Sequence, residues 1–358
     1  MKKNGVIAVL LTCVLCLFSG CSLTQPVPPK EPSHTISPTT VPTDPPVSEL
    51  TVHFLDVGQA DAIILRCEDD TMIIDGGNTA DSSKIIAYLK KLNVPHIDYM
   101  ICTHAHEDHV GGLSAPLSVM PVGGVYAPKA ESDSRAYQTF KQKVAAQNSE
   151  IMHPVNYELL GIGSAKAEIL ASPNSDNLNN TSIIVKVTHK NNSFLFTGDA
   201  ETEEEQLLTG KNFLNSDVLK VAHHGSDTST SYSFLREVMP EYAVISVGKN
   251  NQYGHPSEAV LSRLRDAGAQ MYRTDLQGDI IMKSDGDTIT VTTSKNEDIQ
   301  TNETAPEYDA GIYIGNRRSK KFHRTDCNTL PSEKNRIEFI NRSDAVNEGY
   351  TPCGNCRP

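Results

Sequence analysis

Apolar residues in the first half of the chain fall into short runs separated by one clearly helical stretch. The short runs predict buried strands, whereas apolar residues at helical spacing over 82–94 predict an amphipathic helix. The predicted strands of this half are 51–57, 61–67, 71–77, 97–103 and 122–128, and a second helix is predicted near 134–147.

The second half alternates strands and helices in the same way. Predicted strands are 165–171, 182–187, 193–199, 217–222, 242–247, 280–283 and 288–292, and predicted helices are 201–208, 231–238 and 257–267. Strand runs without intervening helices stand at both ends of this region. The pattern predicts an α+β fold, in which two mixed sheets pack together with helices outside.

The N-terminus has the pattern of an export signal. Basic Lys2 and Lys3 precede an apolar run from Val6 to Phe18, which is too short to span a bilayer as a permanent helix. The following residues "LFSGC" resemble a bacterial lipobox, with Cys21 as the lipidated residue, although Phe18 replaces the usual Leu. We predict a signal peptide over 1–21 and a lipid anchor in the bacterial cell membrane. The alternative is an ordinary secretory signal, and both place the protein outside the cytoplasm.

Composition divides the rest of the chain. Residues 22–48 contain eight prolines among Ser and Thr, which predicts an extended tether. The main domain is predicted over 49–293, a polar linker over 294–310 and a small domain over 311–358. Net charge is −12, yet the last 48 residues carry nine Lys and Arg against five Asp and Glu. The molecule as a whole is therefore no general polyanion binder, whereas its tail is basic.

The most polar stretch of the main domain follows a buried strand and carries four metal-binding side chains. His104, His106, Asp108 and His109 form the pattern H-x-H-x-D-H, and imidazole and carboxylate groups suit zinc and similar ions. Residues two apart in an extended segment face the same side, so His104 and His106 can share an ion. Asp108 and His109 can face a second ion, and the glycines 111–112 allow close packing. The alternative, a hydrophilic loop, leaves the spacing unexplained.

Further candidate ligands follow later apolar strands, since four side chains underfill two ions. Asp199 follows one strand, where it can bridge two ions, cap the next helix or do both. His223 and His224 follow another strand, and His255 precedes a helix. Asp75 also ends a strand, where we expect it to orient a ligand histidine.

Seven motifs, in order between residues 50 and 293, carry a family resemblance. The H-x-H-x-D-H motif followed by "TGD" looks like the metallo-β-lactamase fold. More closely, the motifs resemble the extracellular nuclease-type domain of bacterial competence DNA-uptake proteins: "FLDVGQADAIIL", "IIDGG", "THAHEDHVGG", "NNTSIIVKV", "FLFTGDAE", "DVLKVAHHGSDTSTS" and "YAVISVGKNNQYGHPSEAVLSRL".

The resemblance implies an αββα sandwich with two divalent ions, Zn²⁺ or Mn²⁺, at one edge of the sheets. By this resemblance His104 and His106 bind one ion, Asp108 and His109 bind the other, and Asp199 bridges them. It also implies hydrolysis by metal-activated water, in which two ions clamp the attacking and leaving oxygens.

The catalytic residues implied by the resemblance are Asp108, His224 and His255. His224 is expected as an additional metal ligand, and His255 either binds metal or donates to a phosphate. The role of His223 stays open. Ser226 and Thr228 either hydrogen-bond a phosphate oxygen or cap a helix.

Two departures from the family pattern stand out. Many members of the superfamily have a metal-binding histidine some twenty residues before the bridging aspartate, where this chain has Asn180 and Ser182. We expect Asn180 to lie beside the ligands, so that the first ion lacks a ligand or gains one from His223 or His224. No segment after Phe18 is apolar enough to span a membrane, so we expect no DNA channel in this chain.

The tail carries a second set of metal-binding residues. His323, Cys327, Cys353 and Cys356 combine an H-x3-C and a C-x2-C pattern, which predicts a Cys3His structural zinc site. A disulfide is the alternative in an exported protein. The segment resembles the small metal-binding module of DNA alkylation-repair regulators, except that His323 replaces one of four cysteines.

Basic residues surround this second site. They indicate either phosphate contacts with DNA or a solvated surface: Arg317, Arg318, Lys320, Lys321 and Arg324. Together the observations predict an exported, metal-dependent phosphodiesterase that hydrolyses extracellular DNA, with DNA and the membrane as partners. The alternatives are a hydrolase of another phosphodiester, such as cell-wall phosphocholine or a nucleotide, and a non-catalytic DNA-capture lipoprotein. A β-lactam hydrolase fits less well, because the motifs resemble the competence DNA-uptake proteins more closely.

Overall fold

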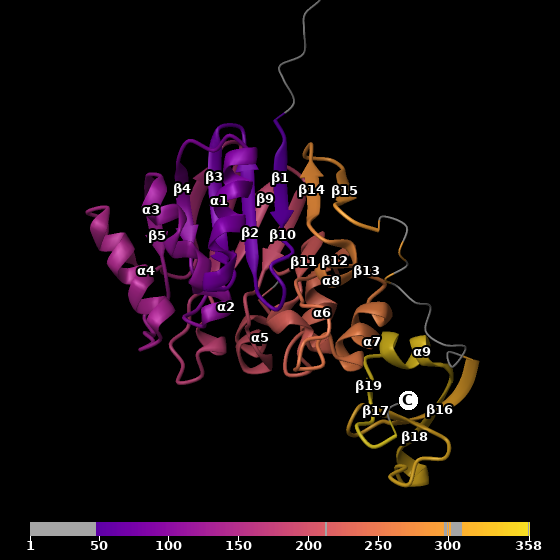
Figure 1. Ribbon diagram of the computed structural model, residues 1–358. Coiled ribbons are helices and arrows are strands. Elements are labelled where there is room, and N and C mark those ends of the chain that lie inside the picture. The colour runs from indigo at the N-terminus through magenta and orange to yellow at the C-terminus, as the bar shows by residue number, and fades with distance from the viewer. Residues whose placement is uncertain (1–47, 212, 297–298, 300, 302–309, 357) are drawn as a thin grey trace, which may run out of the picture. The chain divides into compact units, whose positions relative to one another are not determined.

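Two β-sheets pack face to face, and helices cover their outer faces (Figure 1). The computed structural model describes residues 48–211, 213–296, 299, 301, 310–356 and 358. The predicted signal peptide with Cys21 lies outside the described residues, as do nearly all of the tether 22–48 and most of the linker 294–310. No helix of the described part combines the length and apolarity needed to cross a bilayer.

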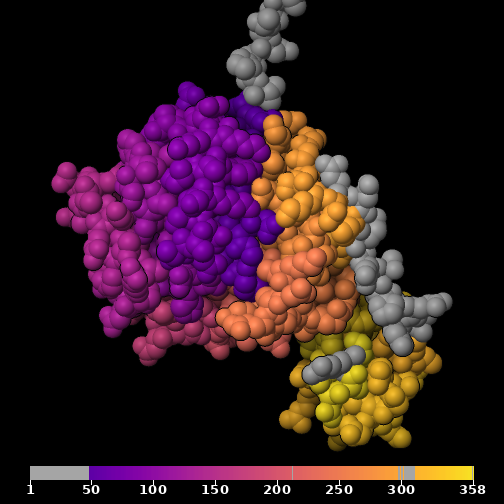
Figure 2. Space-filling model, viewed as in Figure 1, coloured from indigo at the N-terminus to yellow at the C-terminus, as the bar shows by residue number. Residues whose placement is uncertain are grey.

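The first sheet joins the beginning and the end of the main domain. β1 pairs antiparallel with both β2 and β14, and the indigo and orange surfaces therefore adjoin in Figure 2. The strand order is β15-β14-β1-β2-β3-β4-β5-β6. The bounds are β1 Leu50–Phe54, β2 Ala62–Cys67, β3 Asp70–Gly76, β4 Ile97–Ile101, β5 Val122–Tyr126, β6 Ile151–Met152, β14 Ile280–Ser284 and β15 Ile289–Thr293.

The second sheet combines antiparallel and parallel strands. Its order is β13-β12-β11-β10-β9-β8-β7; β10 through β13 run parallel to one another, and β10 is antiparallel to β9. The bounds are β7 Glu158–Ile162, β8 Ala165–Ala171, β9 Ile184–His189, β10 Asn192–Phe196, β11 Val218–Lys220, β12 Tyr242–Ile245 and β13 Gln270–Arg273.

Apolar side chains fill three layers. Phe54 of β1 stacks on Phe196 of β10 between the sheets, with ring centroids 6.1 Å apart. Ile85, Tyr88 and Leu89 recur at helical spacing on α1 and pack on the outer face of the first sheet. The helices of the main domain are α1 Ser82–Lys91, α2 Glu107–Val110, α3 Pro116–Val119, α4 Arg135–Ala146, α5 Thr202–Leu208, α6 Tyr232–Val238, α7 Glu258–Asp266 and α8 Thr274–Gln277.

The predicted α+β class is confirmed, and the long periodic segments form the expected elements. The pattern did not predict β6, β7 or β13, nor the one-turn helices α3 and α8. These elements are short and carry mixed polar and apolar residues, so neither periodicity is visible in them.

The tail forms a small sheet of its own, in the order β18-β16-β17-β19. Phe322, Phe339 and Tyr350 are buried in its core beside Ala345 of α9. The bounds are β16 Ala310–Asn316, β17 Lys321–Arg324, β18 Arg336–Asn341, β19 Thr351–Pro352 and α9 Arg342–Asn347.

The glycine pair after the H-x-H-x-D-H motif allows α2 to lie against the end of β3. A Cβ atom on Gly112 would lie 2.0 Å from the carbonyl oxygen of Gly76, and one on Gly111 would lie 2.4 Å from the backbone nitrogen of Thr79. Gly111 has a helical φ of −55°. Close approach of two backbones, rather than an unusual turn, therefore requires glycine here.

Because no side chain fits in this contact, we expect Gly112→Ala to lower the free energy of unfolding by about 1–3 kcal/mol. Gly161→Ala on β7 is the matched control, since a Cβ atom there meets nothing within 4 Å. Urea denaturation of both variants measures the difference. Equal stability of the two variants would contradict the packing argument.

Candidate metal centre

The polar segments predicted to bind metal follow strands that end at the same edge of the two sheets. The H-x-H-x-D-H segment follows β4, which is parallel to β3, and Asp199 follows β10, which is parallel to β11. His223 and His224 lie in the short turn Ala222–Gly225 after β11. Figure 1 shows α2 and α5 at this end of the sheets. Parallel strands thus bring together residues more than one hundred positions apart.

Asp199 lies at the centre of the cluster, among four imidazole rings. Its Oδ1 atom is 3.2 Å from Nε2 of His109, and its Oδ2 atom is 3.6 Å from Nε2 of His224. The Oδ2 atom also lies 3.8 Å from Nε2 of His223 and 3.9 Å from Nε2 of His104. One carboxylate thus faces histidines of both predicted ligand pairs, which is the geometry that a bridging ligand requires.

Asp108 supplies a second carboxylate on the more open side of the cluster. Its Oδ2 atom lies 3.3 Å from Nε2 of His224 and 3.9 Å from Nε2 of His109. The Asp108 side chain is 31% exposed, against 3% for Asp199. Asp108 is therefore the acidic group of the cluster that solvent reaches most easily.

The buried polar atoms of this cluster fit a divalent cation. Nε2 of His109, Nε2 of His224 and Oδ1 of Asp199 are buried without a hydrogen-bond partner among the described residues. Leaving such atoms unsatisfied costs about 1–3 kcal/mol each. Asp108, His109, Asp199 and His224 offer ligand atoms that all lie within 4.8 Å of one another. Nitrogen and carboxylate donors in this arrangement suit zinc and related ions.

Burial and neighbouring charges shift the pKa values of Asp199 and His224 in opposite directions, and the charges have the larger effect. Burial raises the pKa of Asp199, but the imidazoles of His109 and His224 outweigh it and hold that pKa well below the ordinary range. Burial lowers the pKa of His224, but nearby carboxylates, Asp199 first, raise it to about 10. Burial and the charge of His109 hold the pKa of His104 well below its usual value. Asp199 therefore stays charged and His104 stays neutral, which are the forms that bind metal, whereas His224 must lose a proton when a cation binds.

Asp75 fixes the ring of His109 from behind. Its Oδ2 atom lies 2.8 Å from Nδ1 of His109 and accepts from the Thr103 hydroxyl at 2.7 Å. Its Oδ1 atom accepts from the backbone N–H of Thr103 at 2.8 Å. With Nδ1 held by this carboxylate, Nε2 of His109 faces Asp199. This is the arrangement by which a carboxylate orients a ligand histidine.

Asp61 and Lys220 were not identified from the sequence as part of the site. The Asp61 carboxylate lies 3.4 Å from Nδ1 of His224 and 2.7 Å from Nζ of Lys220, and all three side chains are buried. His224 also lies 3.0 Å, again through Nδ1, from the carbonyl oxygen of Ser246. The sequence did contain a signal, namely a lysine inside one apolar strand and an aspartate next to another. This signal identifies a buried ion pair only when the two residues are known to be neighbours in the fold.

His223 and His224 both have left-handed backbone conformations, with φ of 50° and 52°. Asp75 has a φ of 58°. Such conformations cost on the order of 1–3 kcal/mol each for residues other than glycine. Three strained residues therefore meet at the cluster, and the surrounding hydrogen bonds hold them there.

The remaining predicted residues lie around this centre. Nδ1 of His106 is 3.0 Å from Nε2 of His104. The His255 ring packs edge-on against His223, with centroids 5.7 Å apart. Asn180 accepts a hydrogen bond from the backbone N–H of Glu201 and donates one to the Glu203 carboxylate, so it lies at the start of α5 and bonds there to residues that are not candidate ligands.

Several alternatives are settled by the local geometry. The N-cap position of α5 is Glu201, so the interpretation of Asp199 as a helix cap is wrong. Ser231 caps α6 by accepting from Phe234 N–H, so Ser226 and Thr228 do not serve that role. Their hydroxyls instead lie 3.0 Å apart.

The tail gathers its four predicted ligands into one cluster. Ligand atoms of His323, Cys327, Cys353 and Cys356 lie within 4.8 Å of one another, and the described cysteines form no disulfide. Burial raises the pKa of the Cys353 thiol, but backbone N–H groups of Cys356 and Asn355 outweigh it and bring that pKa to about 7. The thiolate form binds metal, so this set fits a structural zinc ion.

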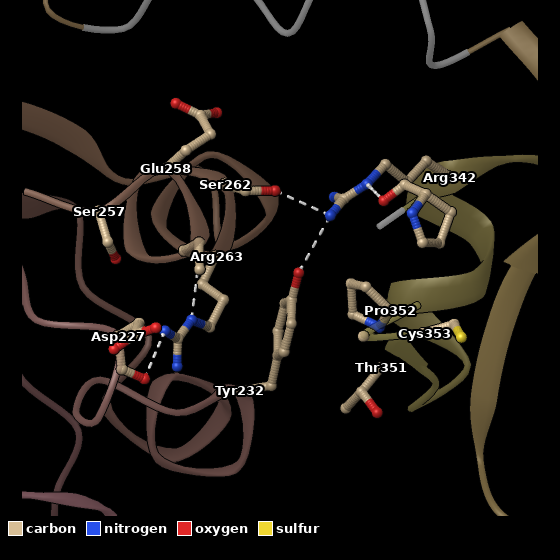
Figure 3. Close-up of a pocket in the computed structure, with 13 residues that line it drawn as sticks. Asp227, Tyr232, Ser257, Glu258, Ser262, Arg263, Arg342, Thr351, Pro352 and Cys353 are labelled. Atoms are coloured by element: carbon tan, nitrogen blue, oxygen red, sulfur yellow. Dashed lines mark hydrogen bonds between the residues drawn. The ribbon is translucent and has the colours of Figure 1, made fainter. Parts of the chain in front are cut away.

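A pocket is lined by residues of α6, α7 and the tail (Figure 3). Arg342 of α9 reaches across it and donates to the Ser262 hydroxyl at 2.8 Å and to the Tyr232 hydroxyl at 3.2 Å. It also pairs with Asp266. This arginine joins the tail to α6 and α7.

Fold and site together define a metal-dependent hydrolase. The sequence profile of the Metallo-beta-lactamase superfamily matches residues 55–249, and the chain belongs to that superfamily. Residues 297–358 match the profile "Metal binding domain of Ada". Both family resemblances predicted from the sequence motifs are thus confirmed.

Curated relatives match the main domain. Competence protein ComA of Neisseria gonorrhoeae is 35% identical over 236 residues, covering 65% of this chain and 32% of the relative. ComE operon protein 3 of Bacillus subtilis is 30% identical, covering 65% and 33%. Recombination protein 2 of Haemophilus influenzae is 30% identical, covering 64% and 28%. The chain therefore spans about a third of the length of these relatives.

Replacing the central carboxylate tests the metal centre. We expect Asp199→Asn to weaken divalent-metal binding by at least about 100-fold, because the cluster loses the anion that faces four imidazoles. Metal content by mass spectrometry and calorimetric titration measure this loss. Asp287→Asn, at an exposed loop position, is the control. Unchanged affinity in Asp199→Asn would exclude a role for Asp199 in binding the ions.

The tail site has its own test. We expect Cys356→Ser to remove one equivalent of zinc from the full chain and to lower the thermal stability of the tail, since structural zinc supplies folding energy. Cys67→Ala, a buried cysteine of β2, should keep that zinc. A disulfide among Cys327, Cys353 and Cys356, found by peptide mapping of the native protein, would refute the zinc assignment.

Proposed function

We propose that this chain is an exported, lipid-anchored phosphodiesterase that hydrolyses extracellular DNA. The observation that carries the proposal is the Asp199 carboxylate buried among four imidazoles at the open edge of the sheets. One curated relative is named a competence protein and another a recombination protein, which supports DNA as the substrate class. The predicted export signal, with Cys21 as the predicted lipidated residue, is the basis for the proposed location.

The proposed centre separates holding groups from reacting groups. Divalent cations at the cluster would lower the pKa of water and neutralise charge on a phosphate. His104, His109 and Asp199 are almost fully buried and would hold such ions. The half-exposed Asp108 carboxylate would accept a hydrogen bond from the attacking water and orient it.

We propose that His255 donates to a phosphate oxygen. The Gln59 side chain accepts from Gly248 N–H at 3.0 Å, which turns its amide nitrogen toward Nδ1 of His255 at 3.4 Å. Nδ1 is then the acceptor, so the ring proton lies on Nε2. Burial lowers the pKa of His255, and the charges of His223 and His224 lower it further. The ring is therefore a neutral N–H donor at pH 7.

The tail would supply phosphate contacts. Its basic side chains are exposed around the small sheet: Arg317, Arg318, Lys320, Lys321 and Arg324. Exposed lysines and arginines bind the DNA backbone without reading sequence, in a salt-dependent way. Such contacts would keep DNA near an otherwise acidic domain.

Cleavage assays test the proposal. We expect the purified protein, loaded with Mn²⁺ or Zn²⁺, to cut plasmid or single-stranded DNA, and His104→Ala to cut at least about 100-fold more slowly because a buried ligand is lost. His96→Ala, at an exposed position paired with Asp98, should match the wild type. Metal-loaded wild-type protein that leaves every DNA substrate intact would overturn the proposal.

A further inference from the structure

One exposed aromatic side chain lies directly beside the metal centre. Tyr253 is 63% exposed and belongs to the loop between β12 and α7. Its ring stacks on His255, with centroids 5.7 Å apart and planes at 26°. The His255 ring in turn meets His223 edge-on at 5.7 Å. Tyr253 is thus two ring contacts away from a histidine that faces Asp199.

The loop presents this ring in a fixed position. The Asn251 side-chain oxygen accepts from the backbone N–H of Tyr253 at 3.1 Å and of His255 at 3.0 Å. Its amide nitrogen donates to the carbonyl oxygens of Gly248 at 2.9 Å and His255 at 2.6 Å. One asparagine therefore ties the loop together around Tyr253. A ring ordered in advance loses little conformational entropy on binding.

The chemistry of the exposed face favours a flat, uncharged aromatic ligand. One face of Tyr253 packs on His255, so its exposed area lies on the opposite face and the hydroxyl edge. Isolated exposed aromatic residues are ordinary, but this one is stacked, fixed and adjacent to the reacting groups. Nucleobases stack on such rings without regard to sequence.

We propose that Tyr253 is a stacking platform for the nucleobase next to the phosphate that is cleaved. This inference rests on the proposed function and adds the substrate contact that the acidic metal centre lacks. A quaternary ammonium group, as in phosphocholine, is recognised by a cage of several aromatic faces. Among the described residues, the ring that stacks on Tyr253 is the single imidazole of His255, so the several aromatic faces of such a cage are not present.

Equilibrium binding tests the platform separately from cleavage. The probes are a fluorescein-labelled single-stranded 12-mer with phosphorothioate linkages, which resist hydrolysis, and an abasic 12-mer with the same linkages. Fluorescence anisotropy is measured with the metal-loaded full chain. We expect Tyr253→Ala to weaken binding of the base-containing probe by about 5- to 150-fold and to leave the abasic probe unchanged. Tyr253→Phe should bind both probes like the wild type.

Tyr157→Ala is the matched control, because Tyr157 is 50% exposed but packs on Phe213 instead of a candidate ligand. Equal weakening of both probes by Tyr253→Ala would overturn the platform, as would no weakening of either. So would weaker binding of a phosphocholine ester in Tyr253→Ala with oligonucleotide binding unchanged. If the wild type cleaves no DNA, the hydrolytic function fails, yet base-dependent binding that is lost in Tyr253→Ala would still support the platform.

Discussion

The structure of the site depends on one constraint: the negative charge of Asp199 is buried away from solvent. Moving a carboxylate out of water costs several kcal/mol unless opposite charge and hydrogen bonds replace the lost hydration. Four imidazoles surround the Asp199 carboxylate. The backbone N–H of Asp199 donates to the Ser182 hydroxyl at 3.0 Å, which holds the residue in place. Because those groups come from both sheets, the charge is tolerated only when the sandwich is complete.

The same constraint explains the strain around the cluster. Asp75, His223 and His224 occupy left-handed conformations that unfolded chains avoid. Each places a side chain toward the cluster, and each lies at the end of a strand rooted in the apolar layers. The strained conformations at the site lower the free energy of unfolding, and packing of the apolar layers offsets this loss.

Sequence reasoning found the residues whose signal is local. His104 to His109, Asp199 and His223–His224 each follow an apolar strand directly, so strand prediction also predicts where they meet. Asp61 and Lys220 escaped because they act only as a pair, and positions 159 residues apart in the chain show no common pattern. Short elements such as β6 and β13 escaped for a similar reason, since neighbouring strands rather than their own residues define them.

The turn between β1 and β2 shows how the two halves of the site are held in register. Gln59 bonds to the loop that carries His255, and two residues later Asp61 contacts His224. The Asp61 N–H also donates to the carbonyl oxygen of Asp108 at 3.1 Å. One turn of the first sheet thus fixes both histidines of the second sheet and the motif that follows β4. The metal ligands of the two sheets lie in register only in the complete sandwich, so we expect metal binding to be coupled to folding.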